Sequence, residues 1–138
     1  MIGIIDYGLG NIKAFETVYK KLNIPVQIAD NKKKLLSSKK LILPGVGSFD
    51  TAMKLLSNSG LKNIISEMVL EKQIPILGIC VGMQIMTVES EEGKSKGLGW
   101  INSKVKKFRK QDSEKYLPIP HMGWNEIEIK NKKGLFKN

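Results

Sequence analysis

The sequence predicts an α/β fold with a doubly wound, mostly parallel sheet and flanking helices. The first observation is that short apolar runs alternate with segments of helical periodicity over residues 2–90. The second is that these runs are barely interrupted by polar residues, as expected for strands covered on both faces. The third is that turns rich in glycine follow the runs, where a strand gives way to a helix.

The first part of this pattern lies before residue 40. Residues 2–6 predict a buried strand, and the turn after it ends at Asn11, which can cap a helix. Residues 25–29 predict a second strand, followed by a lysine-rich turn or short helix through Ser38. The helix after Asn11 is expected to present an apolar stripe made of Ile12, Phe15, Val18, Tyr19 and Leu22.

The second part repeats the alternation. Residues 41–43 predict a third strand, after which Ser48 can cap another helix. Residues 61–72 form a further amphipathic helix, and residues 74–79 predict a fourth strand. Because the carboxyl ends of parallel strands share one edge of the sheet, the turns that follow residues 2–6, 41–43 and 74–79 are expected to meet there.

The remainder of the chain has a different character. Residues 81–90 look like a helix, and residues 105–108, 116–119 and 124–129 look like strands. These strands are expected to form an antiparallel C-terminal region. With neither repeats nor a low-complexity tract, residues 1–138 are predicted to form a single domain.

Composition restricts the class of protein. The hydrophobic fraction of 41% and the charged fraction of 26% are typical of a soluble globular chain. One cysteine excludes an internal disulfide framework, and no apolar run is long enough to span a bilayer, so a cytoplasmic protein is expected. The net charge of +10 comes almost entirely from dispersed lysines, and Arg109 is the only arginine. That pattern favours a solvated surface, or a basic face for an anionic substrate, over nucleic-acid recognition.

The only cysteine, Cys80, lies between Gly78 and Gly82, after an apolar run and before a helix-like segment. A strand, a sharp turn and a helix make a nucleophile elbow, in which glycines leave room where strand and helix crowd together. A sulfur at a helix N-terminus is expected to favour the thiolate, the nucleophilic form. The alternative is a small buried apolar residue, which a single cysteine usually is.

Two other groups of residues bear on chemistry. The segment Pro44-Gly45-Val46-Gly47 can turn backbone N–H groups toward an oxyanion, together with the N–H of Val81, although an ordinary tight turn is the alternative. His121, the only histidine, is a candidate base for the thiol, but a lone histidine beside prolines is more often structural or interfacial. Trp124 can be a core residue or an exposed anchor for a partner.

The chain resembles the class I glutamine amidotransferases, and within them the glutaminase subunits of imidazole glycerol phosphate synthases. The resemblance covers essentially the whole chain. It is carried by four blocks, which are Asp6-Tyr7-Gly8-Leu9-Gly10-Asn11, Pro44-Gly45-Val46-Gly47-Ser48-Phe49, Gly78-Ile79-Cys80-Val81-Gly82-Met83-Gln84 and Pro120-His121-Met122-Gly123-Trp124-Asn125.

The resemblance implies a specific division of roles. Cys80 would attack the side-chain amide of glutamine, forming a glutamyl thioester that is then hydrolysed. Val46 and Val81 would supply the oxyanion hole, and Gly47 and Gln84 would hold the substrate. The surface that faces the partner would include Asn11, His121, Trp124 and Asn125.

The resemblance also implies a partner. Ammonia would pass to a cyclase subunit with a (β/α)8 barrel, in a heterodimer that makes imidazole glycerol phosphate for histidine biosynthesis. It implies no cofactor, no metal, no nucleic acid and no membrane. The family's triad ends in a Phe-His-Pro-Glu-type block that supplies the catalytic histidine and glutamate. This chain lacks that block and is expected to be C-terminally truncated.

Three alternatives stay open from the sequence. A paralogous glutaminase subunit would feed ammonia to an amidino-sugar synthase. A non-catalytic remnant would keep Cys80 without turning over glutamine. An unrelated cysteine hydrolase would use His121 as its base.

Overall fold

A computed structural model describes residues 1–109, 123–130 and 134–136 of the chain. The chain divides into two compact units, Met1–Lys107 and Phe108–Asn138, and each is described by itself. Residues 116–119, which the sequence predicted as a strand, lie outside the described residues, as does His121.

The first unit is built on a four-stranded parallel sheet in the order β2-β1-β3-β4. The strands are β1 (Ile2–Ile5), β2 (Val26–Ala29), β3 (Lys40–Gly45) and β4 (Ile76–Cys80). All four predicted strands are therefore present, and the predicted parallel sheet is confirmed. The third strand is longer than expected, because Pro44 and Gly45 continue it and pair with β4.

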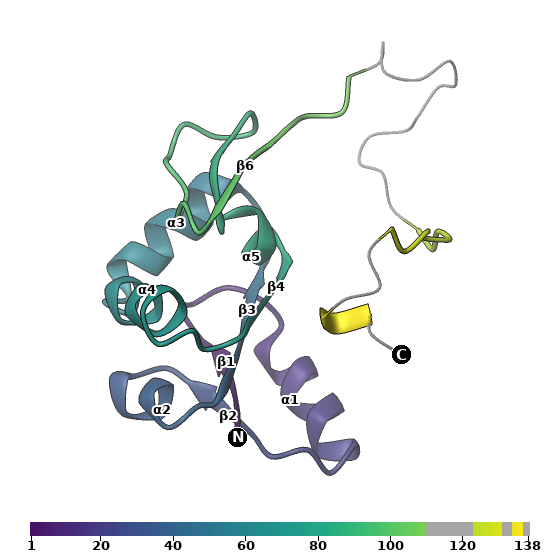
Figure 1. Ribbon diagram of the computed structural model, residues 1–138. Coiled ribbons are helices and arrows are strands. Elements are labelled where there is room, and N and C mark those ends of the chain that lie inside the picture. Colours follow the sequence, from purple (N-terminus) through teal and green to yellow (C-terminus); the bar gives the residue numbers. More distant parts are fainter. Residues whose placement is uncertain (110–122, 131–133, 137–138) are drawn as a thin grey trace. The chain divides into compact units, whose positions relative to one another are not determined.

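Helices cover both faces of this sheet (Figure 1). On one face α1 (Ile12–Lys21) packs on Ile4 and Ile42, and on the other α3 (Phe49–Asn58) and α4 (Lys62–Leu70) pack on Leu41 and Leu43. Successive residues of a strand point to opposite faces, so adjacent apolar residues such as these serve two cores. The short helix α2 (Lys32–Leu36) joins β2 to β3 and buries its Leu35 in the larger core.

The predicted helix caps are confirmed. The Asn11 side chain accepts a hydrogen bond from the N–H of Ala14 at 3.2 Å, and the Ser48 hydroxyl accepts one from the N–H of Thr51 at 3.1 Å. The predicted apolar stripe of α1 is wrong at its C-terminal end, where Val18 and Leu22 are exposed. The small core on that face is filled by Ile12, Phe15 and Tyr19, so a narrower stripe suffices.

The helix predicted over residues 81–90 is also wrong. A single turn, α5 (Val81–Gln84), follows Cys80, and the chain then becomes β5 (Thr87–Ser90). Backbone pairing explains the change: the carbonyls of Ile85 and Met86 accept hydrogen bonds from the N–H groups of Leu98 and Ile101. A β-branched sequence from residue 87 joins that pairing more readily than it extends a helix.

The later strands differ from the prediction. The strand β6 (Ile101–Val105) ends where the predicted strand 105–108 was to begin, and it pairs with β5 in parallel. Within the described residues, antiparallel pairing after Cys80 is limited to an isolated bridge between Glu89 and Lys96. Residues 124–129 are not a strand, and the second unit contains a short 3-10 helix, η2 (Gly134–Phe136). No helix among the described residues combines the length and apolar character that a bilayer crossing needs.

Candidate active site

The carboxyl ends of β1, β3 and β4 lie at one edge of the sheet, as the sequence predicted. These three strands are neighbours and run parallel, so the turns that follow them emerge together. The last pair in the register between β3 and β4 joins Gly45 to Cys80. The cysteine therefore lies beside the Pro44-Gly45-Val46-Gly47 segment rather than in an apolar interior.

Cys80 occupies a strained corner between β4 and α5. Its backbone angles are φ 55° and ψ −123°, which is outside the left-handed helical region and is normally adopted by glycine. The thiol is exposed. Non-glycine residues in such conformations cost free energy and cluster at functional sites, so the alternative of an ordinary buried cysteine does not describe this residue.

The two flanking glycines are required by close packing. A Cβ atom on Gly82 would lie 1.9 Å from the carbonyl oxygen of Leu43, and one on Gly78 would lie 2.5 Å from the Cα of Met83. Only a residue without a side chain allows α5 to fold back against β3 and β4 at these distances. The same contacts fix the direction in which the corner presents Cys80.

The end of β3 and the residues after it lie against this corner. Gly45 is the last residue of β3, and a Cβ atom there would lie 2.3 Å from the backbone nitrogen of Gly82. Val46 and Gly47 follow as exposed residues, and Gly47 has a φ of 78°. Val81 is buried at the first position of α5, and Gln84 at its end is half-buried. The structure thus brings Gly45, which precedes the predicted Val46 and Gly47, against the elbow that carries Cys80.

Sequence reasoning missed the residue that ties the turn after β1 to this segment. The hydroxyl of Tyr7 donates a hydrogen bond of 2.7 Å to the carbonyl of Pro44, and Tyr7 is only 4% exposed. Burial raises the pKa of Tyr7 to about 12, so the phenol stays a donor at neutral pH. The sequence could have pointed to Tyr7, because it directly follows a buried strand and begins a glycine-rich turn.

Asp50 is a second residue that the sequence did not single out. It lies in the first turn of α3, and its carboxylate accepts hydrogen bonds from the backbone N–H groups of Ser95 at 2.8 Å and Lys94 at 3.0 Å. These bonds hold the pKa of Asp50 below its usual value. The helix that begins after Gly47 is thereby joined to the loop between β5 and β6.

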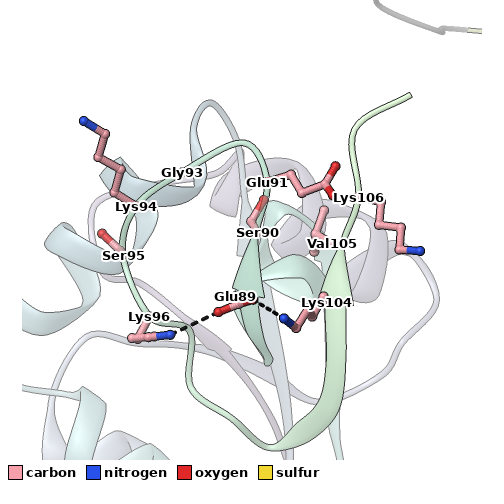
Figure 2. A pocket seen from close by; sticks show the side chains of 10 residues that line it. All are labelled: Glu89, Ser90, Glu91, Gly93, Lys94, Ser95, Lys96, Lys104, Val105 and Lys106. Atoms are coloured by element: carbon pink, nitrogen blue, oxygen red, sulfur yellow. Dashed lines mark hydrogen bonds and ion pairs between the residues drawn. The ribbon is translucent and has the colours of Figure 1, made fainter. Parts of the chain in front are cut away.

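That loop borders a cavity of about 360 Å³ between β5 and β6 (Figure 2). Glu89 is one of its lining residues and forms ion pairs with Lys96 and Lys104. The hydrogen bond from Lys104 has the largest effect on the pKa of Glu89, followed by that from Lys96, and both lower it. Cys80 and Gly45 are not among its lining residues. The carboxylate of Glu89 is already paired with two lysines, and the candidate site stays at Cys80.

The residues predicted to face a partner are exposed wherever the structure describes them. Asn11 is exposed, although its side-chain oxygen is used as the cap of α1. Trp124 is fully exposed, and its neighbour Asn125 is exposed as well. Trp124 is therefore not a core residue of the described part of the chain.

Comparison with known proteins gives consistent matches. The family model "Glutamine amidotransferase class-I" matches residues 3–138. "Imidazole glycerol phosphate synthase subunit HisH" from Leptospira interrogans is 54% identical over 92% of this chain and 62% of its own length. The proteins of the same name from Leptospira borgpetersenii and Bdellovibrio bacteriovorus are 50% and 47% identical, over 100% and 99% of this chain and 68% and 67% of their lengths.

A solved structure agrees with these sequences. "Crystal structure of glutamine amidotransferase" matches with a TM-score of 0.63 at 25% identity, over 76% of this chain and 55% of that chain. The chain thus spans about 62% of the length of its Leptospira interrogans relative, and this shared part contains both the elbow and the segment beside it.

Proposed function

Because the chain belongs to the class I glutamine amidotransferase family, we propose that it takes part in hydrolysing glutamine to glutamate and ammonia, with Cys80 as the nucleophile. The observation that carries this proposal is the exposed thiol on a strained corner, in register with Gly45 at the end of β3. A strained backbone conformation persists only where the surrounding structure holds it in place. Here the close-packed backbones of Gly45, Gly78 and Gly82 hold Cys80 in that conformation.

The proposed reaction starts at this thiol. The Cys80 sulfur forms a bond to the side-chain carbonyl carbon of glutamine, and the carbonyl electron pair moves onto oxygen. Collapse of this intermediate expels the nitrogen, which leaves as ammonia once it has been protonated, and water then releases glutamate from the thioester. The resemblance assigns the acid–base steps to a histidine paired with a glutamate, and no residue of this chain is given that role.

Backbone N–H groups stabilise the negative charge on oxygen. We assign them to Val46 and Val81, which flank the contact between the end of β3 and the start of α5. Gly47 and Gln84 hold the glutamine. The positive φ of Gly47, which a side chain would strain, and the half-buried position of Gln84 at the end of α5 support this assignment.

The ammonia is proposed to pass to a cyclase subunit with a (β/α)8 barrel, for imidazole glycerol phosphate synthesis in the cytoplasm. The names of the relatives support a role as one subunit of that synthase. The partner surface is assigned to Asn11, His121, Trp124 and Asn125. A fully exposed tryptophan with a neighbouring exposed amide supports it, because aromatic side chains commonly anchor interfaces.

Glutamate release from glutamine, measured with and without a cyclase subunit, tests the proposal. Release that requires the partner and is lost in Cys80→Ser supports it. Absence of release, with the chain folded and the partner bound, leaves the non-catalytic remnant. Binding to an amidino-sugar synthase in preference to the cyclase favours the paralogous subunit, and loss of activity in His121→Ala favours a hydrolase that uses His121.

A further inference from the structure

The Tyr7 hydroxyl donates a hydrogen bond to a carbonyl of β3 that lies beyond the pairing with β1. The pairing of β1 with β3 ends at Ile4 and Ile42, so β1 gives no partner to the last residues of β3. Beyond that point Tyr7 turns inward, and its hydroxyl reaches the Pro44 carbonyl at 2.7 Å. Pro44 itself is fully buried, so this bond replaces solvent that the carbonyl has lost.

The same turn also contacts Pro44 through its backbone. A Cβ atom on Gly10, which has a φ of 96°, would lie 2.9 Å from the Cβ of Pro44. The turn after β1 therefore holds Pro44 in two ways, by a hydrogen bond to its carbonyl and by close packing on its ring. The peptide group between Pro44 and Gly45 has little room to rotate.

The next residue explains why this restraint matters. Gly45 has no side chain, so backbone contacts fix its conformation: its pairing with Cys80, the backbone of Gly82 and the peptide groups on either side. The N–H of Val46 follows directly, and its direction depends on the two dihedral angles of Gly45. A donor that stabilises an oxyanion must already point at the reacting oxygen, because reorientation during the reaction costs part of the stabilisation.

We propose that Tyr7 is a positioning residue for the oxyanion hole: by holding the Pro44 carbonyl, its hydroxyl aims the N–H of Val46 at the reacting oxygen. This role rests on the proposed function. It assigns the first turn of the chain to the reaction without any contact between Tyr7 and the substrate. It requires only the phenolic hydroxyl, since the ring would keep its place in the core without it.

The test compares Tyr7→Phe with the wild-type chain in two reactions of Cys80. The first probe is a diazo-ketone analogue of glutamine. The sulfur adds to its ketone carbon and places negative charge on an oxygen in the position of the amide oxygen; the diazo carbon is then protonated, and the sulfur moves to that carbon as nitrogen gas leaves and the ketone re-forms. The second probe is iodoacetamide, which needs no oxyanion hole. We expect Tyr7→Phe to lower the maximal rate with the diazo ketone about tenfold, with half-saturation and the iodoacetamide rate within twofold of wild type.

Tyr19→Phe is the matched control, because Tyr19 packs on the other face of the sheet, in the core beneath α1. It should leave both rates unchanged. Equal diazo-ketone rates for wild type and Tyr7→Phe would overturn the role of Tyr7 and leave the proposed function standing. An equal change in the rates with both reagents would also overturn that role, because it would indicate that the substitution loosens the structure around Cys80. A wild-type chain that reacts with the diazo ketone without saturation would instead refute the proposed function, and this role with it.

Discussion

Backbone strain at Cys80 can be measured with two substitutions that differ only by a methyl group. Cys80→Gly should be more stable than Cys80→Ala, because glycine adopts the observed angles without strain, whereas alanine keeps the strained conformation. Such strain costs about 1–3 kcal/mol. Glycine also stabilises the unfolded chain by about 0.4–1 kcal/mol relative to alanine, because it has more conformational freedom there, and this reduces the difference between the two variants.

The net expectation is that Cys80→Gly exceeds Cys80→Ala by about 1 kcal/mol in the free energy of unfolding. Loss of side-chain contacts cancels in this comparison, and the exposed position keeps it small in any case. For a domain of this size the melting temperatures should differ by about 4 °C. Urea unfolding followed by circular dichroism gives the free energies.

Met83 provides a control of opposite sign. It lies within α5 and is 47% exposed, so Met83→Gly should be less stable than Met83→Ala by about 0.5–1 kcal/mol. If alanine were as stable as glycine at position 80 while the Met83 pair behaved as expected, the corner would carry no strain, and the argument that singles out Cys80 would fail.

Three further outcomes follow from the packing and the titrating groups. Gly82→Ala forces a methyl group to within 1.9 Å of the Leu43 carbonyl oxygen, and we expect it to lower the free energy of unfolding by about 3 kcal/mol in urea titrations. Hydrogen bonds from the backbone N–H groups of Ser95 and Lys94 lower the pKa of Asp50, so the stabilisation that they provide is present above about pH 4 and is lost as the pH falls below it. Asp50→Asn should therefore flatten the fall of the urea midpoint below about pH 4. The raised pKa of Tyr7 acts in the opposite direction, and stability should fall from pH 10 to about 12 in wild type and less steeply in Tyr7→Phe.

Local chemistry determined most of the first unit. Asn11 and Ser48 cap their helices because a side-chain oxygen one or two bonds from Cβ reaches the free N–H groups of the first turn, whatever the rest of the chain does. The apolar runs became parallel strands because each is short and covered on both faces. Gly78 and Gly82 predicted the turn at Cys80, because the close packing of strand and helix there leaves no space for a side chain.

Tertiary structure decided what depends on distant partners. The segment after α5 became a strand because residues 101–105 supply its hydrogen bonds, and no local pattern contains that information. The extension of β3 through Pro44 and Gly45 required β4 beside it. The hydrogen bond from Tyr7 to Pro44 joins residues 37 positions apart, and they meet because β1 and β3 are neighbours in the sheet. Residue types therefore singled out Cys80 as the proposed nucleophile, while the fold selected the groups that surround it.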